Sequence, residues 1–375
     1  MRRTVVLAAT AALSAGLLSG ASAGEVPSSQ RPAVFETVFA SPLGLEGLTT
    51  DGRGNLYTPA RGADPCPVYR VAATGGPAAV VGTIPAPCGP AGLTFDRRGR
   101  LYVANADTVV SFVPDAANPP AATVFARGVP GANGLAFDRA GALWISDGGT
   151  GQGRVWRAGS DGVAAEMFRV QPLVSDVIAG GVGRDVRGLL PGTVTITPTG
   201  RTAADTAGSQ HIVANGLAFT EDGTLLVADT ARGALWRVPM DRAGRPRAAT
   251  GCDAAFPANT LCLDDLDVQH PYLEGADGIV LDRAGNVWTA ANERNAIVLA
   301  RRDGRVVEYF RNPADAATKL RNGGPLEFPT SPVLLPDGRL CVTQSDGNRR
   351  DNSPNTAGEA GPGKAALAKV SCVSR

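Results

Sequence analysis

One phrase recurs along this chain and constrains its fold more than any other feature: an apolar strand, a turn that ends in Gly, and a second apolar strand. Each copy keeps the same spacing, because its first residue lies eight positions before its turn Gly. The six copies begin at Glu46, Ala91, Asn133, Asn215, Asp277 and Thr330. Hairpins repeated in this way, each followed by further strand patterns, predict an all-β, six-bladed β-propeller.

The two ends of the chain predict how the ring of blades closes. The segment Ala33 to Ser41 looks like a fourth strand without a blade of its own, and Ala366 to Val373 is a third-strand pattern with no fourth strand after it. We therefore expect the N-terminal strand to complete the last blade. The longest interval between copies predicts an insertion at about residues 171–209, and residues 24–375 form a single propeller domain.

The first 23 residues have the pattern of a secretory signal peptide. Arg2 and Arg3 precede an apolar run, which ends in the cleavage sequence Ala21-Ser22-Ala23. The mature protein is thus expected to be secreted or periplasmic, with no membrane span after cleavage. Its net charge of +1 argues against nucleic acid or an anionic membrane as the main partner, so we expect a monomer that acts on a small molecule.

The cysteine count is even, and the cysteines follow an export signal, so disulfide bonds are expected. The sequence alone permits many connectivities. Local pairing within blades is our prediction, whereas a zinc site is disfavoured because the chain has no C-x-x-C motif and only 2 His. The predicted pairs are Cys66 with Cys88, Cys252 with Cys262, and Cys341 with Cys372.

The repeated phrase is uniform at its turn and variable at its first position. Asp opens and Gly closes most turns, which is typical of a structural role. The first positions of a propeller's inner strands converge on the central axis, and here they bring together Glu46, Asn133, Asn215 and Asp277. Facing carboxylates repel unless a cation neutralises them, and carboxylate and amide oxygens suit Ca²⁺ best, although another divalent cation is possible. The alternative is that Asn-Gly and Asp-Gly are simply good turn pairs.

These same motifs carry a family resemblance. EGL at Glu46, NGLAF at Asn133 and Asn215, and DGI at Asp277 resemble the metal positions of the SMP-30/gluconolactonase family, whose relatives include diisopropylfluorophosphatase and the paraoxonases. The resemblance implies that Glu46, Asn215 and Asp277 ligate the metal and that Asn133 ligates it or holds the substrate. It also implies that Asp277 is the catalytic base or nucleophile.

Some positions depart from the family pattern or remain candidates. Gly131 stands where gluconolactonases carry an Arg that holds the sugar. His211 and His270 lie before a blade's first position and are expected to be surface or packing residues. Asp147 and Thr330 are candidate substrate-binding residues. Acidic residues after the second strands could also reach the rim: Asp64, Asp107, Asp147, Asp229, Glu293 and Asp346.

The predicted function is hydrolysis of a lactone or related ester, in which Ca²⁺ polarises the carbonyl group and Asp277 activates water. A Ser-His-Asp triad is disfavoured, because no GxSxG motif occurs. Two other classes stay open. One is a non-catalytic NHL-like propeller that binds a partner, and the other is a propeller lyase or isomerase that uses the same metal.

Overall fold

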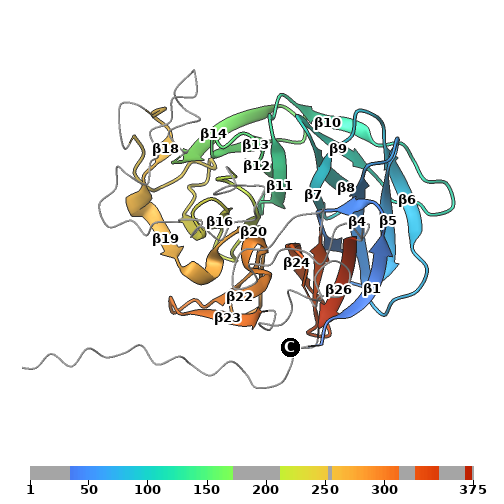
Figure 1. The fold of residues 1–375 in the computed structure, drawn as a ribbon. Coiled ribbons are helices and arrows are strands. Elements are labelled where there is room, and N and C mark those ends of the chain that lie inside the picture. The colour runs from blue at the N-terminus through green and yellow to red at the C-terminus, as the bar shows by residue number, and fades with distance from the viewer. Residues whose placement is uncertain (1–33, 172–211, 252–255, 312–325, 346–367, 374–375) are drawn as a thin grey trace, which may run out of the picture.

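The computed structural model describes residues 34–171, 212–251, 256–311, 326–345 and 368–373. Six antiparallel sheets lie around a common centre (Figure 1), which confirms the six-bladed β-propeller. Blades are numbered here from the first copy of the repeat. The predicted signal peptide, the insertion at about 171–209, His211 and Asp346 lie mostly or wholly outside the described residues.

The first three blades follow the order of the repeat. The first contains β2 (Gly44–Leu45), β3 (Thr49–Thr50), β4 (Asn55–Arg61), β5 (Cys66–Ala72) and β6 (Ala79–Ile84). The second contains β7 (Pro90–Phe95), β8 (Leu101–Asn105), β9 (Thr108–Phe112) and β10 (Thr123–Arg127). The third contains β11 (Ala132–Phe137), β12 (Leu143–Asp147), β13 (Arg154–Ala158), β14 (Ala164–Val170) and β18 (Thr260–Leu261), which runs parallel to β14.

The remaining blades include three short 3-10 helices. The fourth contains β15 (Leu217–Phe219), β16 (Leu225–Asp229), β17 (Ala234–Val238) and β19 (Leu266–Gln269), with η2 (Leu263–Asp265) before β19. The fifth contains β20 (Ala276–Leu281), β21 (Val287–Ala291), β22 (Ala296–Ala300) and β23 (Val306–Arg311), with η3 (Pro271–Leu273) and η4 (Asn292–Arg294). The last contains β24 (Pro329–Leu334), β25 (Leu340–Gln344), β26 (Ala368–Val373) and β1 (Glu36–Ser41).

The last sheet contains both ends of the described chain. Its strand order is β1-β26-β25-β24, and β1 pairs antiparallel with β26, with Glu36 opposite Cys372 and Ser41 opposite Ala368. In Figure 1 the blue β1 accordingly lies beside the red β26. The outer strand of this blade therefore comes from the start of the chain and its three inner strands come from the end.

Two of the predicted disulfides are present. Cys66 is bonded to Cys88, and Cys341 is bonded to Cys372, which lies directly opposite it in the ladder between β25 and β26. The third predicted pair includes Cys252, which lies outside the described residues. Disulfides indicate an oxidising compartment. No helix in the described ranges has the length and apolarity that a membrane crossing requires.

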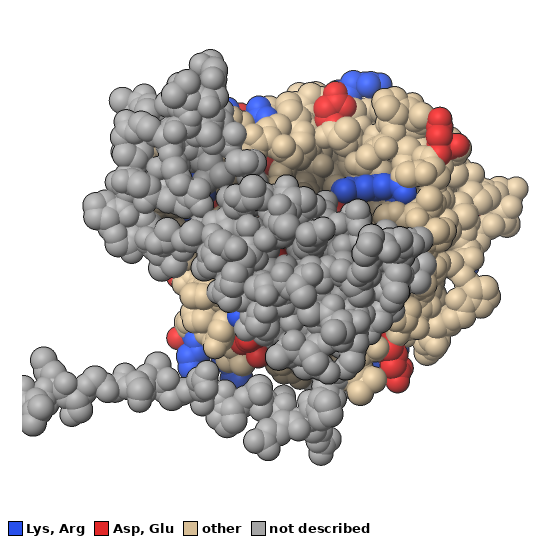
Figure 2. Space-filling view, viewed as in Figure 1, with Lys and Arg blue, Asp and Glu red and all other residues tan. Residues whose placement is uncertain are grey.

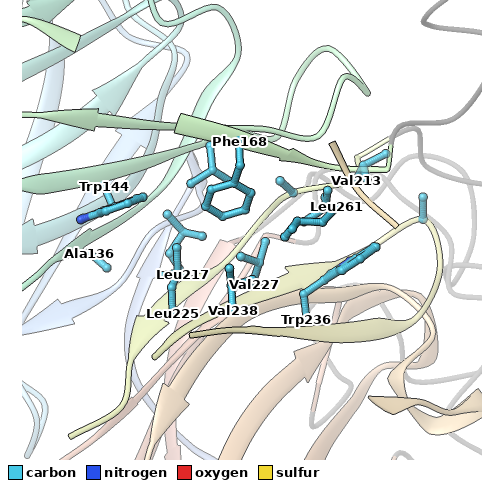
Figure 3. Packing of buried hydrophobic residues seen from close by; sticks show 14 of the residues in the cluster. Ala136, Trp144, Phe168, Val213, Leu217, Leu225, Val227, Trp236, Val238 and Leu261 are labelled. Carbon is cyan, nitrogen blue, oxygen red and sulfur yellow. The ribbon is translucent and has the colours of Figure 1, made fainter. Parts of the chain in front are cut away.

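Apolar residues pack in layers between neighbouring blades, as the alternation within each strand predicts. The layer between the third and fourth blades contains Trp144, Phe168 and Trp236, all 1% exposed or less. Figure 3 shows Trp144 and Phe168 of the third blade facing Leu217, Val227 and Trp236 of the fourth. Burial of each such side chain contributes about 1.5–3 kcal/mol, so these layers hold the inner strands rigidly around the axis.

The hairpin turns between the first two strands of each blade confirm the structural role of their Asp residues. Asp138 is representative, because its Oδ1 accepts a hydrogen bond from the Ala142 amide at 2.9 Å and its Oδ2 accepts one from Trp144 Nε1 at 3.0 Å. The Gly that closes this turn, Gly141, has φ +87°, a conformation that residues with a Cβ rarely adopt. We call this end of the blades the turn end.

Candidate functional site

The six first-position residues lie at the opposite end of the inner strands, which we call the ring end. In β7, β11, β20 and β24 the pairing with the second strand shifts register across the first and second positions of the repeat. A β-bulge of this kind bends the strand and redirects a side chain, and such bulges are frequent beside active sites. The variable position of the repeat is therefore also the irregular position of the strand.

Second-position glycines show that the ring is continuous. A Cβ at each of them would collide with the carbonyl oxygen of the next blade's first-position residue. The distance from the added Cβ to that oxygen would be 2.3 Å for Gly47 and Ala91, 2.4 Å for Gly92 and Asn133, 2.2 Å for Gly134 and Asn215, 2.4 Å for Gly216 and Asp277, and 2.5 Å for Gly278 and Thr330. Glycine is thus required here by the close approach of neighbouring blades, and not only by turn formation.

Hydroxyl groups bridge the same junctions. Ser146 Oγ accepts a hydrogen bond from the Gly134 amide at 2.7 Å and donates to the Asn215 carbonyl oxygen at 2.5 Å. At the closing junction, the Thr330 hydroxyl donates to the Glu46 carbonyl oxygen at 2.6 Å. Thr330 is fully buried, so this side chain closes the ring, and its predicted contact with substrate stays a prediction.

The two ring carboxylates have different surroundings. Asp277 is 5% exposed, and its Oδ2 accepts a hydrogen bond from Asn292 Nδ2 at 3.0 Å. Glu46 is 8% exposed, and its buried Oε2 has no hydrogen-bond donor among the described residues. The cation beside it is Arg61, whose Nη1 lies 3.4 Å from Oε2 and whose Nε donates to the Pro90 carbonyl oxygen at 2.6 Å. Neither Arg61 nor Asn292 was among the residues predicted from the sequence to form the site.

The two ring amides also differ. Asn215 is 2% exposed, and its Nδ2 donates to the Thr230 hydroxyl at 3.0 Å. That hydrogen bond orients the Asn215 amide and fixes which of its atoms is the oxygen. Asn133 is only partly buried, and its side chain lies where a Cβ on Gly148 would be, 2.3 Å from Nδ2. The Asn133 side chain therefore fits only because Gly148 has no Cβ.

Asp147 lies beside Asn133 but is engaged by its own loop. It is fully buried, accepts a hydrogen bond from Arg154 Nε at 2.6 Å, and also binds the Thr150 hydroxyl. Gly131 has φ +67°, and a Cβ there would lie 2.5 Å from Asp147 Oδ1. An Arg at that position would require both backbone strain and displacement of Asp147. Contact between Asp147 and a substrate stays a prediction.

The other candidate residues lie apart from the ring or are paired. Asp64 and Asp107 are exposed. Asp229 is fully buried against Arg232 Nη1 at 2.8 Å, and burial raises the pKa of its carboxyl group, although Arg232 opposes that rise. Glu293 is buried in η4. His270 is half-buried and caps η3, where its Nδ1 accepts a hydrogen bond from the Tyr272 amide at 3.1 Å.

Cations at the ring end are mostly neutralised by neighbouring carboxylates. Besides Arg154 and Arg232, Arg294 contacts Glu308 at 2.8 Å and Lys369 contacts Glu327 at 3.3 Å. Where described atoms are visible in Figure 2, acidic and basic side chains are likewise scattered rather than gathered into a patch of one sign. In the described part of the chain, most charged groups at the ring end are therefore paired.

The chemistry of the ring can be tested against a metal ion. Within the described ranges no three His, Cys, Asp or Glu side chains form a metal-binding group, so a cation here would rely on two carboxylates and two amides. Oxygen ligands of this kind suit a hard ion such as Ca²⁺. The buried Glu46 Oε2, which lacks a hydrogen-bond donor, fits such an ion.

Comparison with solved structures shows the same fold in other proteins. Regucalcin of Agrobacterium tumefaciens, described as a calcium-binding protein, aligns with a TM-score of 0.53 and 19% identity over 92% of this chain and 96% of its own. A luciferin-regenerating enzyme aligns at 0.55 and 14%, over 92% and 95%. The PQQ-bound aldose sugar dehydrogenase of Streptomyces coelicolor aligns at 0.54 and 18%, over 91% and 97%. At these identities the likeness shows the fold alone.

Comparison with curated protein sequences found no match. A family model does match, and it covers residues 67–327, which include three of the four predicted ligands and four of the six blades completely. The chain belongs to the SMP-30/gluconolactonase/LRE-like family.

Proposed function

We propose that the protein is a calcium-dependent hydrolase of a lactone or related ester, with Glu46, Asn133, Asn215 and Asp277 as the metal ligands. The observation that carries the proposal is the buried Glu46 Oε2, which has no hydrogen-bond donor. An oxygen in this state costs about 1–3 kcal/mol unless a partner compensates it. Arg61 compensates only in part, because its side chain is 38% exposed and its contact is 3.4 Å long.

In the proposed reaction, Asp277 carries out the proton transfers. When bound, Ca²⁺ would polarise the substrate carbonyl group and stabilise the negative charge that develops on its oxygen. Asp277 takes a proton from the attacking water, whose oxygen bonds to the carbonyl carbon. The bond from that carbon to the leaving oxygen then breaks, and the proton passes from Asp277 to the leaving alkoxide. A lactone would thus yield a hydroxy acid.

The neighbours of Asp277 support this role. Asn292 donates to its Oδ2 and so holds the carboxylate in one orientation, which a general base needs. Asn133 is the most accessible of the four proposed ligands, and for that reason we assign it a second role in holding the substrate. The family match and the calcium-binding description of the regucalcin neighbour support the proposed calcium dependence.

We also propose that the protein acts outside the cytoplasm on a small molecule. The signal-peptide pattern of residues 1–23 and the two described disulfides support export. The nearly balanced charge supports a small substrate rather than a polyanion.

A substrate panel with and without chelator tests the proposed function. Lactones, aryl esters and phosphotriesters are assayed with the mature protein in Ca²⁺ and in EDTA, and hydrolysis of at least one lactone or ester should require Ca²⁺. Glu46→Gln should weaken Ca²⁺ affinity, and excess Ca²⁺ should partly restore its rate. Full activity of metal-free wild type would overturn the proposal. Inactivity on the whole panel would favour a binding module, and an unsaturated or rearranged product would favour a lyase or isomerase.

A further inference from the structure

A cavity lies at the turn end of the blades, away from the ring. Its volume is about 640 Å³, and it lies between the hairpin turns of the third and fourth blades, beside the segment Met240 to Arg247. Asn133 and Asp138 are five residues apart on the same inner strand, so about 16 Å separates this cavity from the ring. A cavity of this size is typical of sites for small molecules.

The inner wall of the cavity is apolar and aromatic. Phe137, Trp144, Phe219 and Met240 line it, and Trp144 belongs to the packed layer shown in Figure 3. The wall is ordered by the turn at Asp241, in which Arg245 Nε donates to Asp241 Oδ2 at 2.9 Å. Such a wall offers contact area to a flat apolar group, and its Trp144 Nε1 already donates to Asp138.

One cation is held in place within this wall. The Nε and Nη2 atoms of Arg157 each lie 3.3 Å from Asp138 Oδ2, and the guanidinium carbon lies 5.9 Å from the centre of the Trp144 ring. Gly244 packs against the same pair, because a Cβ there would lie 3.1 Å from Trp144 and 3.2 Å from Arg157. Arg157 is therefore ordered before any ligand arrives, which lowers the entropic cost of binding.

The rim holds more cations, and these have no partners. Among the described residues, no hydrogen bond or ion pair engages the side chains of Arg97, Arg139, Arg242 and Arg247. The lining acids are mostly engaged: Asp138 by Arg157, Asp241 by Arg245, and Asp222 by the turn that contains Thr220 and Thr224. In the part of the chain that the structure describes, no cation pairs with Glu221 or Asp222, since the hydrogen bonds of Asp222 come from neutral groups, so these two lining acids oppose the four rim arginines. The cations of the ring end are by contrast ion-paired.

We propose that this cavity binds a small amphiphilic anion, one that joins a flat apolar group to a carboxylate, sulfonate or phosphate. The aromatic wall takes the apolar group, and the rim arginines take the charge. Several cations around one concave site also raise the local concentration of anions, an effect that falls as the salt concentration rises. The proposal concerns a site separate from the ring and does not depend on the hydrolase function.

Calorimetric titration with 2-naphthalenesulfonate tests this proposal on the mature protein at low ionic strength. We expect saturable binding that weakens with salt, and roughly tenfold weaker binding of both 2-naphthol, which lacks the charge, and methanesulfonate, which lacks the ring. The double variant Arg242→Gln/Arg247→Gln should lose at least roughly tenfold in affinity. The double variant Arg53→Gln/Arg127→Gln removes the same charge from exposed positions outside the cavity and should bind as wild type does.

Three outcomes would overturn the proposal: no binding of 2-naphthalenesulfonate, equal binding of 2-naphthol, or equal loss of affinity in the two double variants. Asp277→Asn locates the site, because it should bind 2-naphthalenesulfonate with unchanged affinity. A change of affinity in that variant, or a dependence of the binding on Ca²⁺, would place the anion at the ring and would also contradict the proposal.

Discussion

The two ends of the inner strands obey different rules. At the turn end, Asp and Gly repeat from blade to blade and their side chains and backbone complete the hairpins. At the ring end, the first position changes from blade to blade, and it coincides with a bulge in four of them. The turn residues that repeat thus stabilise each blade by itself, whereas the first-position residues that vary form the ring that the six blades share.

Charge separates the two ends as well. Burial acts to raise the pKa of Asp282 in the turn of the fifth blade, but hydrogen bonds from Asn286 and Trp288 outweigh it and leave that pKa below its usual value. Burial of Asp229 at the ring end dominates over Arg232 and raises the pKa of that carboxyl group. Local hydrogen bonds therefore stabilise the Asp282 carboxylate, whereas Asp229 depends on Arg232.

Asp277 and Asp282 allow the sharpest test of this division, because they lie at opposite ends of one inner strand. Asp277→Asn should lower kcat at least roughly 100-fold while the fold survives, since it removes the proposed base. Asp282→Asn should keep its activity but lose about 1–2 kcal/mol of unfolding free energy, because its amide would face the donors of Asn286 and Trp288. Steady-state rates and urea unfolding measure the two effects. A similar loss of rate in both variants would break the division between the ends.

Substitutions of two glycines in the third blade separate the cost of a steric clash between blades from the cost of backbone strain. Gly134→Ala should lose about 1–3 kcal/mol of unfolding free energy and weaken Ca²⁺ binding, because the new methyl group would push against the Asn215 carbonyl oxygen. Gly141→Ala should lose only about 1 kcal/mol, because nothing lies within 4 Å and the cost comes from its positive φ alone. Urea unfolding and Ca²⁺ titration measure both. Unchanged Ca²⁺ affinity in Gly134→Ala would contradict the role assigned to the junction.

Arg61 tests whether a cation competes with the metal for Glu46. Arg61→Gln should raise the Ca²⁺ affinity roughly fivefold, which corresponds to about 1 kcal/mol, the upper range for a partly exposed ion pair. Arg53→Gln, at the turn end, removes the same charge and should leave the affinity unchanged. Calorimetric Ca²⁺ titration of both variants decides the matter, and a weaker affinity in Arg61→Gln would show that Arg61 supports the site instead.

His270 should give the smallest effect. Burial and then the nearby Arg294 lower the pKa of His270 below its usual 6.5. The unfolded chain therefore binds a proton more readily than the folded protein does, so stability is lost as the pH falls through 6.5. Urea unfolding at about pH 7.5 and about pH 5.5 should show a smaller loss for His270→Gln than for wild type. The difference should be a few tenths of a kcal/mol, since solvent screens this half-exposed group.

The sequence predicted the fold because the fold is periodic. Each blade repeats the strand alternation and the Asp and Gly turn, so six weak signals reinforce one another. The same register located the first-position ring, since a fixed offset from the turn Gly places Glu46 and Asp277 at equivalent points of different blades. Two of the local disulfides followed from the same periodicity.

The partners of the ring residues could not be predicted in this way. Arg61 and Asn292 occupy the same position of the repeat, 15 residues after the first position, but the residue type at that position changes from blade to blade. The repeat therefore marks the position and does not show which ring residue it contacts. The glycines of the Asn-Gly and Asp-Gly pairs could not be interpreted from the sequence either. A tight turn favours glycine, and so does a close approach between neighbouring blades. Only the approach of the Gly134 and Gly216 backbones to the next blade distinguishes these explanations.

The pairing of β1 with β26 has a consequence for how the protein reaches its native state. In five sheets the first strands follow one another closely in sequence, so their hairpins can form early, although the third sheet also takes β18 from beyond β17. The last sheet joins segments more than 300 residues apart. Closing so long a loop is entropically costly and comes late. Until the C-terminal strand is available, the first and fifth blades have no neighbour on one side, and their apolar faces stay exposed to aggregation. Joining the termini and reopening the chain between two blades should therefore change the folding rate far more than the stability of the finished ring.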